Sequence, residues 1–252
     1  MKQGSKSSAV FFIVLMVCIF PIAAKTLHIQ TIEVAPFGFT GADGEPKGMM
    51  YEISNRIAED AELKYTNRIV PYARTIAELQ SGNADFVLRF SNELLPAVSI
   101  PLVSVISMPI IILTQAGAPF KTLDSLHGKS VGIVRGGKFD VNFDNDAAIH
   151  KYEVDDYAQT LRMLVLGRID GGIGTNVGLY YNANKLGIKP EALNSPIKLS
   201  SKSFMLHFSK KHTDTKIMGA LKASVEKLKK SGEITKIVNK YMGNFQWDIP
   251  TQ

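Results

Sequence analysis

The sequence predicts an α/β protein with two lobes, each a mainly parallel sheet flanked by helices, joined by two crossover strands. Strand-type and helix-type segments alternate along residues 26–90, and the same alternation restarts along residues 129–187. Such alternation is typical of parallel sheets covered by helices. Between the two series, residues 103–117 form an apolar, β-branched segment that is longer than an average strand. A strand that leaves one lobe and enters the other would have this length.

The first series has the order strand, helix, strand, helix, strand. In its first helix, Met50, Ile53 and Ile57 recur at helical spacing, with charged residues on the opposite face. Gly82 is expected to end the second helix, because glycine commonly follows a last helical turn. We expect these elements at residues 26–34, 49–63, 64–70, 72–82 and 84–90.

The second series repeats this order, and the chain then returns. Residues 202–209 are a second apolar strand that crosses back to the first lobe. The other expected elements are strands at 129–137, 151–156 and 169–174, helices at 139–148, 157–168 and 175–187, and two closing amphipathic helices at 214–232 and 233–243. The predicted division is residues 25–112 with 206–252 for lobe one, and 113–205 for lobe two. Ligands of such folds bind at the carboxyl ends of the strands.

The first 24 residues have the layout of an export signal. Lys2 and Lys6 precede an apolar run at residues 9–22, and Ala23 and Ala24 follow it. The run is shorter than the roughly 20 residues of a membrane-spanning helix. We therefore expect cleavage after Ala24, with an uncleaved anchor helix as the alternative. The single cysteine lies in the apolar run, so the mature chain would have no thiol chemistry.

Composition and charge exclude several classes of protein. The 252 residues are 45% hydrophobic with a mean hydropathy of +0.04, which indicates a globular protein rather than a disordered one. The formal charge is +6, and it falls to +4 without residues 1–24, which hold two lysines and no acid. One denser basic run at residues 229–236 is interpreted as a solvated helix face. We expect no nucleic-acid partner.

No motif for catalysis or metal binding is evident. The five histidines are not spaced as metal ligands, and no G-x-S-x-G nucleophile elbow occurs. The acids within residues 140–146 lack the glycine and the final glutamate of a calcium loop. The "GKS" at Gly128 is not a phosphate-binding loop, because Leu123 stands where such a loop requires glycine. We expect no catalytic residue, no metal and no cofactor.

Candidate ligand contacts follow the predicted strands of lobe one. Phe37 and Phe39 come after the first strand, where each ring either stacks on a flat or apolar ligand or fills the core. Tyr72 and Arg74 come after the second strand, and Arg74 either binds a ligand carboxylate or forms a surface ion pair. Arg89 ends the third strand and faces either the ligand or the surface of the lobe.

A glycine pair supplies the candidate contacts of lobe two. Gly136 and Gly137 follow its first strand, and Lys138 comes next. Successive glycines let backbone N–H groups converge on an anion, and a lysine strengthens that attraction. A plain glycine turn is the alternative.

Five motifs occur in a fixed order along the chain. They are "PF" at Pro36 with "GMMYEI" at 48–53, "VPYARTIAELQSGNADFVL" at 70–88, "LHGKSVGIVRGG" at 126–137, "LVLGRID" at 164–170 and "KKSGEITKIVNKYMG" at 229–243. Each motif is weak alone, whereas five in order are strong. Together they resemble the bacterial extracellular solute-binding proteins of family 3, the periplasmic receptors that feed amino-acid ABC transporters. The resemblance covers essentially all of the mature chain and implies the two-lobed periplasmic-binding fold.

Amino-acid receptors of this family, which the chain resembles, hold the ligand's α-carboxylate and α-ammonium groups with a pair of charged residues. The chain departs from this pair at both positions. Those receptors carry an arginine for the α-carboxylate of the ligand, and the matching position here is Asn92 or Glu93. They carry an aspartate for the α-ammonium, and the matching position here is Thr175. The resemblance thus implies a receptor for a small polar or anionic solute that is not held as a standard α-amino acid.

The resemblance implies that the protein captures its solute in the periplasm and delivers it to the membrane permease of an ABC transporter. It implies a monomer that is not an enzyme. Two alternatives stay open. Some relatives with this fold are cyclohexadienyl dehydratases, for which Glu93 would be the acid or base. A sensory receptor would instead present its ligand-bound form to a membrane sensor.

Overall fold

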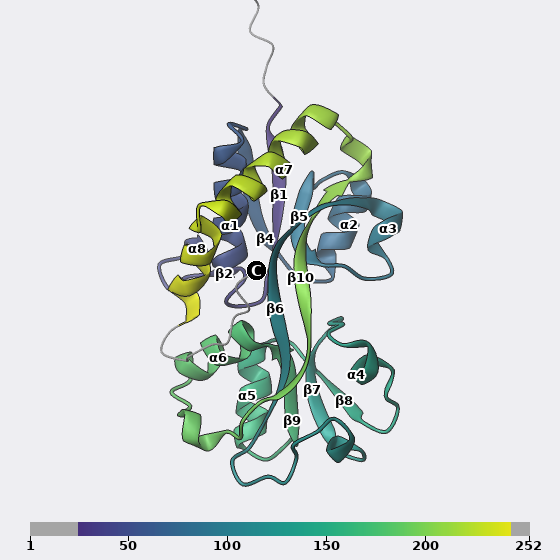
Figure 1. Cartoon of the computed structure of the whole chain (residues 1–252), viewed down its shortest axis with the longest axis vertical. Helices are drawn as coiled ribbons and strands as arrows, with labels where there is room; N and C mark the ends of the chain where they lie inside the picture. The colour runs from purple at the N-terminus through teal and green to yellow at the C-terminus, as the bar shows by residue number, and fades with distance from the viewer. Residues whose placement is uncertain (1–24, 243–252) are drawn as a thin grey trace, which may run out of the picture.

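The protein folds into two α/β lobes that follow each other along the long axis of the molecule (Figure 1). The computed structural model describes residues 25–242. The predicted export signal at residues 1–24, and residues 243–252, lie outside the described part of the chain. The predicted fold class, α/β with crossover strands between two lobes, is confirmed.

A single eight-stranded sheet runs through both lobes, in the order β4-β1-β5-β10-β6-β9-β7-β8. The outer three strands on each side are mutually parallel, and β6 and β10 run antiparallel to their neighbours. A separate two-stranded ribbon joins β2 and β3. The strands are β1 Leu27–Ile32, β2 Phe39–Thr40, β3 Pro46–Lys47, β4 Tyr65–Val70, β5 Phe86–Phe90, β6 Ser99–Thr114, β7 Ser130–Val134, β8 His150–Val154, β9 Gly171–Thr175 and β10 Ile197–Ser209.

The strands β6 and β10 connect the two lobes. They pair with each other from Ile197 opposite Ile112 to Ser209 opposite Ser99. Both are longer than the sequence predicts, because each supplies the hydrogen-bonding edge that extends the other. The assignment of residues 25–112 with 206–252 to lobe one, and of 113–205 to lobe two, stays a prediction.

Within residues 25–242, eight α-helices flank the sheet (Figure 1). The predicted apolar stripe of α1 is confirmed, since Met50, Ile53 and Ile57 are all buried. The helices are α1 Met49–Asp60, α2 Arg74–Ser81, α3 Leu95–Val98, α4 Val141–Asn145, α5 Tyr157–Val165, α6 Asn176–Lys185, α7 Thr215–Lys230 and α8 Glu233–Met242. Short 3-10 turns lie at Asp124–Leu126, Pro190–Ala192 and Lys210–His212.

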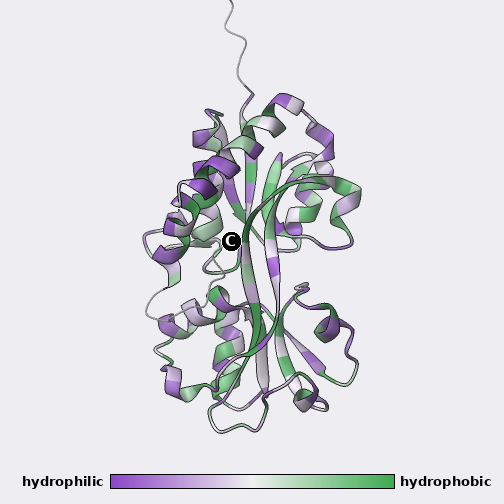
Figure 2. Ribbon diagram, in the orientation of Figure 1, coloured by the Kyte–Doolittle hydropathy of each residue, from purple (hydrophilic) through white to green (hydrophobic). Residues whose placement is uncertain are grey.

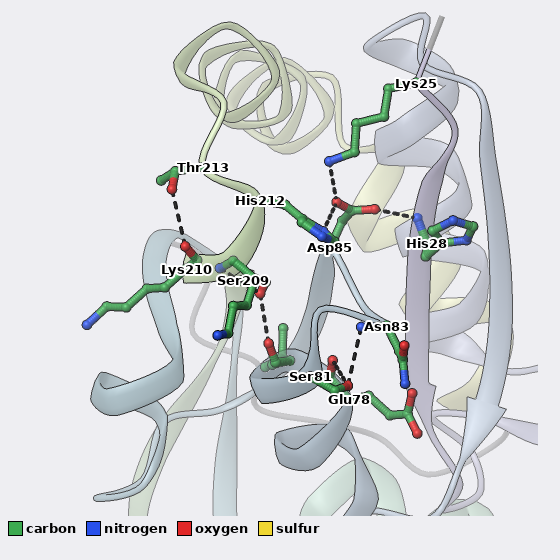
Figure 3. A network of polar contacts seen from close by, with 12 residues as sticks. Lys25, His28, Glu78, Ser81, Asn83, Asp85, Ser209, Lys210, His212 and Thr213 are labelled. Carbon is green, nitrogen blue, oxygen red and sulfur yellow. Dashed lines mark hydrogen bonds and ion pairs between the residues drawn. The ribbon is translucent and has the colours of Figure 1, made fainter.

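A buried carboxylate ties the start of β1 to the segment before α7 (Figure 3). Asp85 accepts hydrogen bonds from Lys25 Nζ at 2.7 Å and from the His28 N–H at 2.8 Å. His212 Nδ1 lies 2.9 Å from the same carboxylate. Burial by itself would raise the pKa of Asp85, but these donors outweigh it and the pKa is lowered. Asp85 is therefore ionised and fixes the end of lobe one that lies away from lobe two.

Candidate functional site

A cavity lies between the lobes, where the parallel strands of both lobes end. Its lining consists of Ile32, Val34, Phe37, Tyr72 and Phe90 from lobe one, Val134, Gly137, Lys138, Phe139 and Tyr157 from lobe two, and Phe204 from β10. The centre of a water molecule can reach about 20 Å³ of this space, enough for about one ordered water. A larger solute therefore enters only if the lobes move apart.

Six aromatic rings dominate the wall of the cavity. The ring centroids of Phe37 and Phe204 lie 5.0 Å apart, and those of Phe90 and Phe204 lie 4.2 Å apart. Phe37 also meets Tyr157 of lobe two edge-on, with 6.5 Å between centroids. Aromatic pairs at these separations attract each other beyond their burial of area. The rings therefore hold the two lobes together across the cavity.

The two phenylalanines at the first bend, Phe37 and Phe39, lie in different environments. Phe37 is 2% exposed and lines the cavity. Phe39 lies in β2 and faces Tyr181 of α6, with ring centroids 6.0 Å apart, and is not among the lining residues. An extended segment would point both rings the same way, but the chain turns between them.

Arg89 is buried and supports the Tyr72 wall from behind. Its guanidinium lies 4.3 Å from the centroid of the Tyr72 ring and donates a hydrogen bond to the Tyr72 carbonyl at 3.3 Å. It also donates to the hydroxyl of Thr75 and, at 3.4 Å, to the carbonyl of Phe90. Arg89 faces the interior of lobe one and is not among the residues that line the cavity.

Arg74 and Glu93 lie on the surface. Arg74 is the first residue of α2 and donates to the Glu78 carboxylate at 2.8 Å, so the surface ion pair is the arrangement that forms. Glu93 is exposed in the loop after β5. Neither residue belongs to the lining of the cavity.

The loop after β7 brings positive charge to the cavity edge. Gly136 adopts a φ of 71°, which favours glycine, while the Gly137 N–H donates to the Val134 carbonyl at 2.7 Å and is therefore already engaged. The carbonyl of Lys138 accepts a hydrogen bond from Lys202 Nζ at 2.5 Å. Burial lowers the pKa of Lys202, which the nearby acidic side chains oppose. Lys138 thus lines the cavity, and Lys202 Nζ lies behind it, 5.7 Å from the ring centroid of the lining residue Phe90 and near Asp144 and Asp140.

Thr175 does not line the cavity but supports Tyr157, which does. Its hydroxyl caps α6 by accepting a hydrogen bond from the Gly178 N–H at 2.9 Å. Its N–H donates to the Tyr157 hydroxyl at 3.4 Å. Burial raises the pKa of Tyr157 above its usual value, so this ring stays neutral at the cavity.

Four aromatic members of the wall are not singled out by the sequence: Phe90, Phe139, Tyr157 and Phe204. A signal exists for Tyr157, which opens the helix after a strand just as the Tyr72 segment does. Phe204 carries no such signal, because it lies in the middle of a crossover strand and reaches the cavity through the pairing of β10 with β5.

Other kinds of site are absent from the described chain. Among residues 25–242, no group of three or more histidine, cysteine or acidic side chains is gathered closely enough to bind a metal ion. In the same residues, no helix has the length and apolarity that crossing a membrane requires.

Comparison with known proteins gives relatives over nearly the whole chain. The "Probable amino-acid-binding protein YxeM" of Bacillus subtilis (strain 168) is 22% identical over 235 residues, which cover 90% of this chain and 87% of that protein. Two solved structures share the fold. An ancestral arginine-binding protein bound to arginine has a TM-score of 0.71 at 22% identity, covering 86% of this chain and 98% of its own.

The second solved structure is a histidine kinase sensor domain with similarity to periplasmic binding proteins. It has a TM-score of 0.72 at 18% identity, and the match covers 87% of this chain and 97% of the domain. Residues 28–244 match the family described as bacterial extracellular solute-binding proteins, family 3. Since this match spans most of the chain, the protein belongs to the bacterial extracellular solute-binding proteins, family 3.

Proposed function

We propose that this protein is a periplasmic receptor that captures a small solute in the cavity between its lobes. The observation that carries the proposal is that both lobes build the cavity wall, with Phe37 and Tyr72 from one and Lys138 and Tyr157 from the other. A ligand between these walls contacts both lobes and so favours their closed arrangement.

The proposed ligand has a flat or apolar body and one anionic group. Six aromatic rings offer faces for the body, and the ammonium group of Lys138, with that of Lys202 behind it, offers the attraction for the anion. None of the described lining residues is a carboxylate, so an α-ammonium group would lack an opposite charge there. The likeness to amino-acid-binding relatives therefore informs the fold of this receptor, whereas the proposed ligand rests on the residues that line the cavity.

The proposed route starts with export and cleavage near Ala24. The receptor then works as a monomer in the periplasm and delivers its solute to the membrane permease of an ABC transporter. Membership of an extracellular family supports this route. The likeness to a kinase sensor domain supports a second candidate role, in which the closed receptor signals to a membrane sensor.

A thermal-shift screen over aromatic carboxylates, keto acids, α-amino acids and polyamines tests the ligand class. A ligand at a hundred times its Kd stabilises the folded state by about 2.7 kcal/mol. For a chain of this size that raises the Tm by roughly 5–10 °C. Aromatic carboxylates should give this shift. A shift given only by α-amino acids or only by cationic compounds would show that the ligand class is wrong.

Two further measurements separate the roles. Loss of uptake of the identified ligand on deletion of the gene supports transport, whereas unchanged uptake with loss of a transcriptional response supports sensing. Incubation of the purified protein with prephenate or arogenate tests the enzymatic alternative, in which product formation would replace the receptor proposal.

A further inference from the structure

The positive charge of the protein is concentrated in one segment. Residues 210–240 contain nine lysines and three acidic residues, a formal charge of +6. Residues 25–209 contain 18 basic and 19 acidic residues, a formal charge of −1. The basic run at residues 229–236 is therefore part of a longer basic segment that ends lobe one.

The lysines of this segment point to solvent, while its apolar residues pack inward. Figure 2 shows hydrophilic residues along the outer faces of α7 and α8. In α7, Leu221, Val225 and Leu228 are buried. The side chains of five exposed lysines form no hydrogen bond or ion pair with any residue between 25 and 242, and these are Lys211, Lys216, Lys222, Lys230 and Lys236. They are free to meet an external anion. We name these five lysines the basic face.

The basic face starts at the end of the molecule where the chain enters lobe one, and its last member, Lys236, lies in α8, which runs along the side of that lobe (Figure 1). Lys25 and His212 both contact the Asp85 carboxylate, and His212 lies directly before α7 (Figure 3). Figure 1 shows α7 at the end of the long axis that is opposite lobe two. The chain before Lys25 contains the apolar run at residues 9–22, so this end of lobe one is next to the membrane during export, before the proposed cleavage near Ala24.

We propose that the basic face docks lobe one on the anionic headgroups of the adjacent bilayer surface. Clustered lysines near a membrane are attracted by the negative surface potential of anionic lipids. Residues 210–240 contain no arginine and no phenylalanine, tyrosine or tryptophan, so the residues that read nucleic acid by forked contacts and stacking are missing. None of the five lysines lines the cavity between the lobes, so docking through the basic face leaves the cavity uncovered.

Vesicle sedimentation with the exported protein tests the proposal. Binding is compared between vesicles of phosphatidylcholine alone and vesicles that also contain phosphatidylglycerol. We expect binding only to the anionic vesicles, and we expect it near 0.01 M salt but not near 1 M, where the screening length falls from about 30 Å to about 3 Å. Equal binding to both vesicle types, or binding that survives high salt, would overturn the proposal.

A pair of charge-matched variants locates the surface. Lys222→Gln with Lys230→Gln removes two charges from the basic face, and Lys121→Gln with Lys189→Gln removes two exposed charges from lobe two. The first variant should weaken binding to anionic vesicles on the order of tenfold or more, and the second by less than about threefold. Equal weakening by the two variants would show that binding depends only on the net charge of the protein, and it would refute the docking surface.

Amine labelling gives an independent measurement on the unaltered protein. Anionic vesicles should protect Lys222 and Lys230 from an amine-reactive reagent and leave Lys121 and Lys189 reactive. Protection of the lobe-two lysines instead would contradict the proposed orientation. Tighter binding to an RNA or DNA oligonucleotide than to anionic vesicles would refute the membrane as the partner.

Discussion

The side chain of Asn182 in α6 donates a hydrogen bond of 2.9 Å to the carbonyl of Ala35, across the boundary between the lobes. Its second amide hydrogen goes to the Gly178 carbonyl at 2.8 Å, so both N–H donors of the side chain are engaged. Asn182 is 6% exposed and is not part of the cavity lining. The closed arrangement thus has a polar contact that does not depend on the solute.

Removing this contact should open the lobes. Asn182→Ala leaves the Ala35 carbonyl without its donor, and a lost hydrogen bond of this kind costs about 1 kcal/mol. We expect a larger radius of gyration in small-angle scattering without added solute, and an affinity for the identified solute that is about fivefold weaker. Asn184→Ala, which changes an exposed residue of the same helix, should leave both values unchanged. Identical scattering of the two variants would contradict the role of Asn182.

Arg89 should matter for stability far more than Arg74 does. Arg89→Met removes the three hydrogen bonds that Arg89 donates to the Tyr72 carbonyl, the Phe90 carbonyl and the Thr75 hydroxyl, and each lost hydrogen bond costs about 1 kcal/mol. We expect the free energy of unfolding to fall by about 2–4 kcal/mol in urea titrations. Arg74→Ala removes an exposed ion pair and should change it by less than about 1 kcal/mol. Similar values for both variants would show that Arg89 does not support the wall.

The buried His207 should make the stability of the fold sensitive to acid. Burial, and then the charge of Arg89, lower the pKa of His207 to about 4. The unfolded chain binds a proton near pH 6.5, so between pH 6.5 and pH 4 it holds more protons than the folded protein does. Stability should therefore fall across this window, by about 2–3 kcal/mol from this one group, and the contribution should be flat below pH 4.

The control for this prediction is a second histidine. His207→Gln should remove that part of the pH dependence in urea titrations, because glutamine does not titrate. His150→Gln, at an exposed position, should keep it. A pH profile of His207→Gln that parallels the unaltered protein would assign the acid sensitivity to other groups.

Tyr157 depends on two glycines that flank its ring. A Cβ at Gly178 would lie 2.3 Å from Cε2 of Tyr157, and a Cβ at Gly174 would lie 2.3 Å from Cε1. Gly178→Ala should therefore displace the ring from the cavity and cost about 1–3 kcal/mol of stability. Gly219→Ala on α7, where a Cβ meets nothing within 4 Å, should stabilise by about 0.5–1 kcal/mol. Thermal unfolding of both variants measures the difference.

The order of elements follows from local pattern, and this is why it is predictable. The spacing of Met50, Ile53 and Ile57 predicts α1, and Gly82 predicts the end of α2, where it adopts a left-handed φ of 83°. The starts of β6 and β10 are not predictable in this way. Their first residues are strands only because the two segments pair with each other.

The candidate site is predictable only in part, because the contacts of a side chain depend on residues that only the tertiary structure brings near it. Phe37, Tyr72, Gly137 and Lys138 line the cavity, as their places after strands suggest. The orientation of Arg89 toward Tyr72 and Thr75 has no sequence signal. The alternation of side chains along a strand predicts which face of the sheet a residue is on, but not which groups accept its hydrogen bonds. The ligand contacts of all these residues stay predictions.

The crossover strands have a consequence for synthesis. In lobe one, Phe86–Phe90 of β5 pairs with Phe204–Phe208 of β10, which leaves the ribosome only after all of β7, β8 and β9 have been made. At the other end, Asn194 bonds back to Thr114, so the intervening stretch closes on itself. The half of the protein that begins later in the gene can therefore complete its sheet first. The half that begins earlier must wait with an open edge at β5 until β10 has been made.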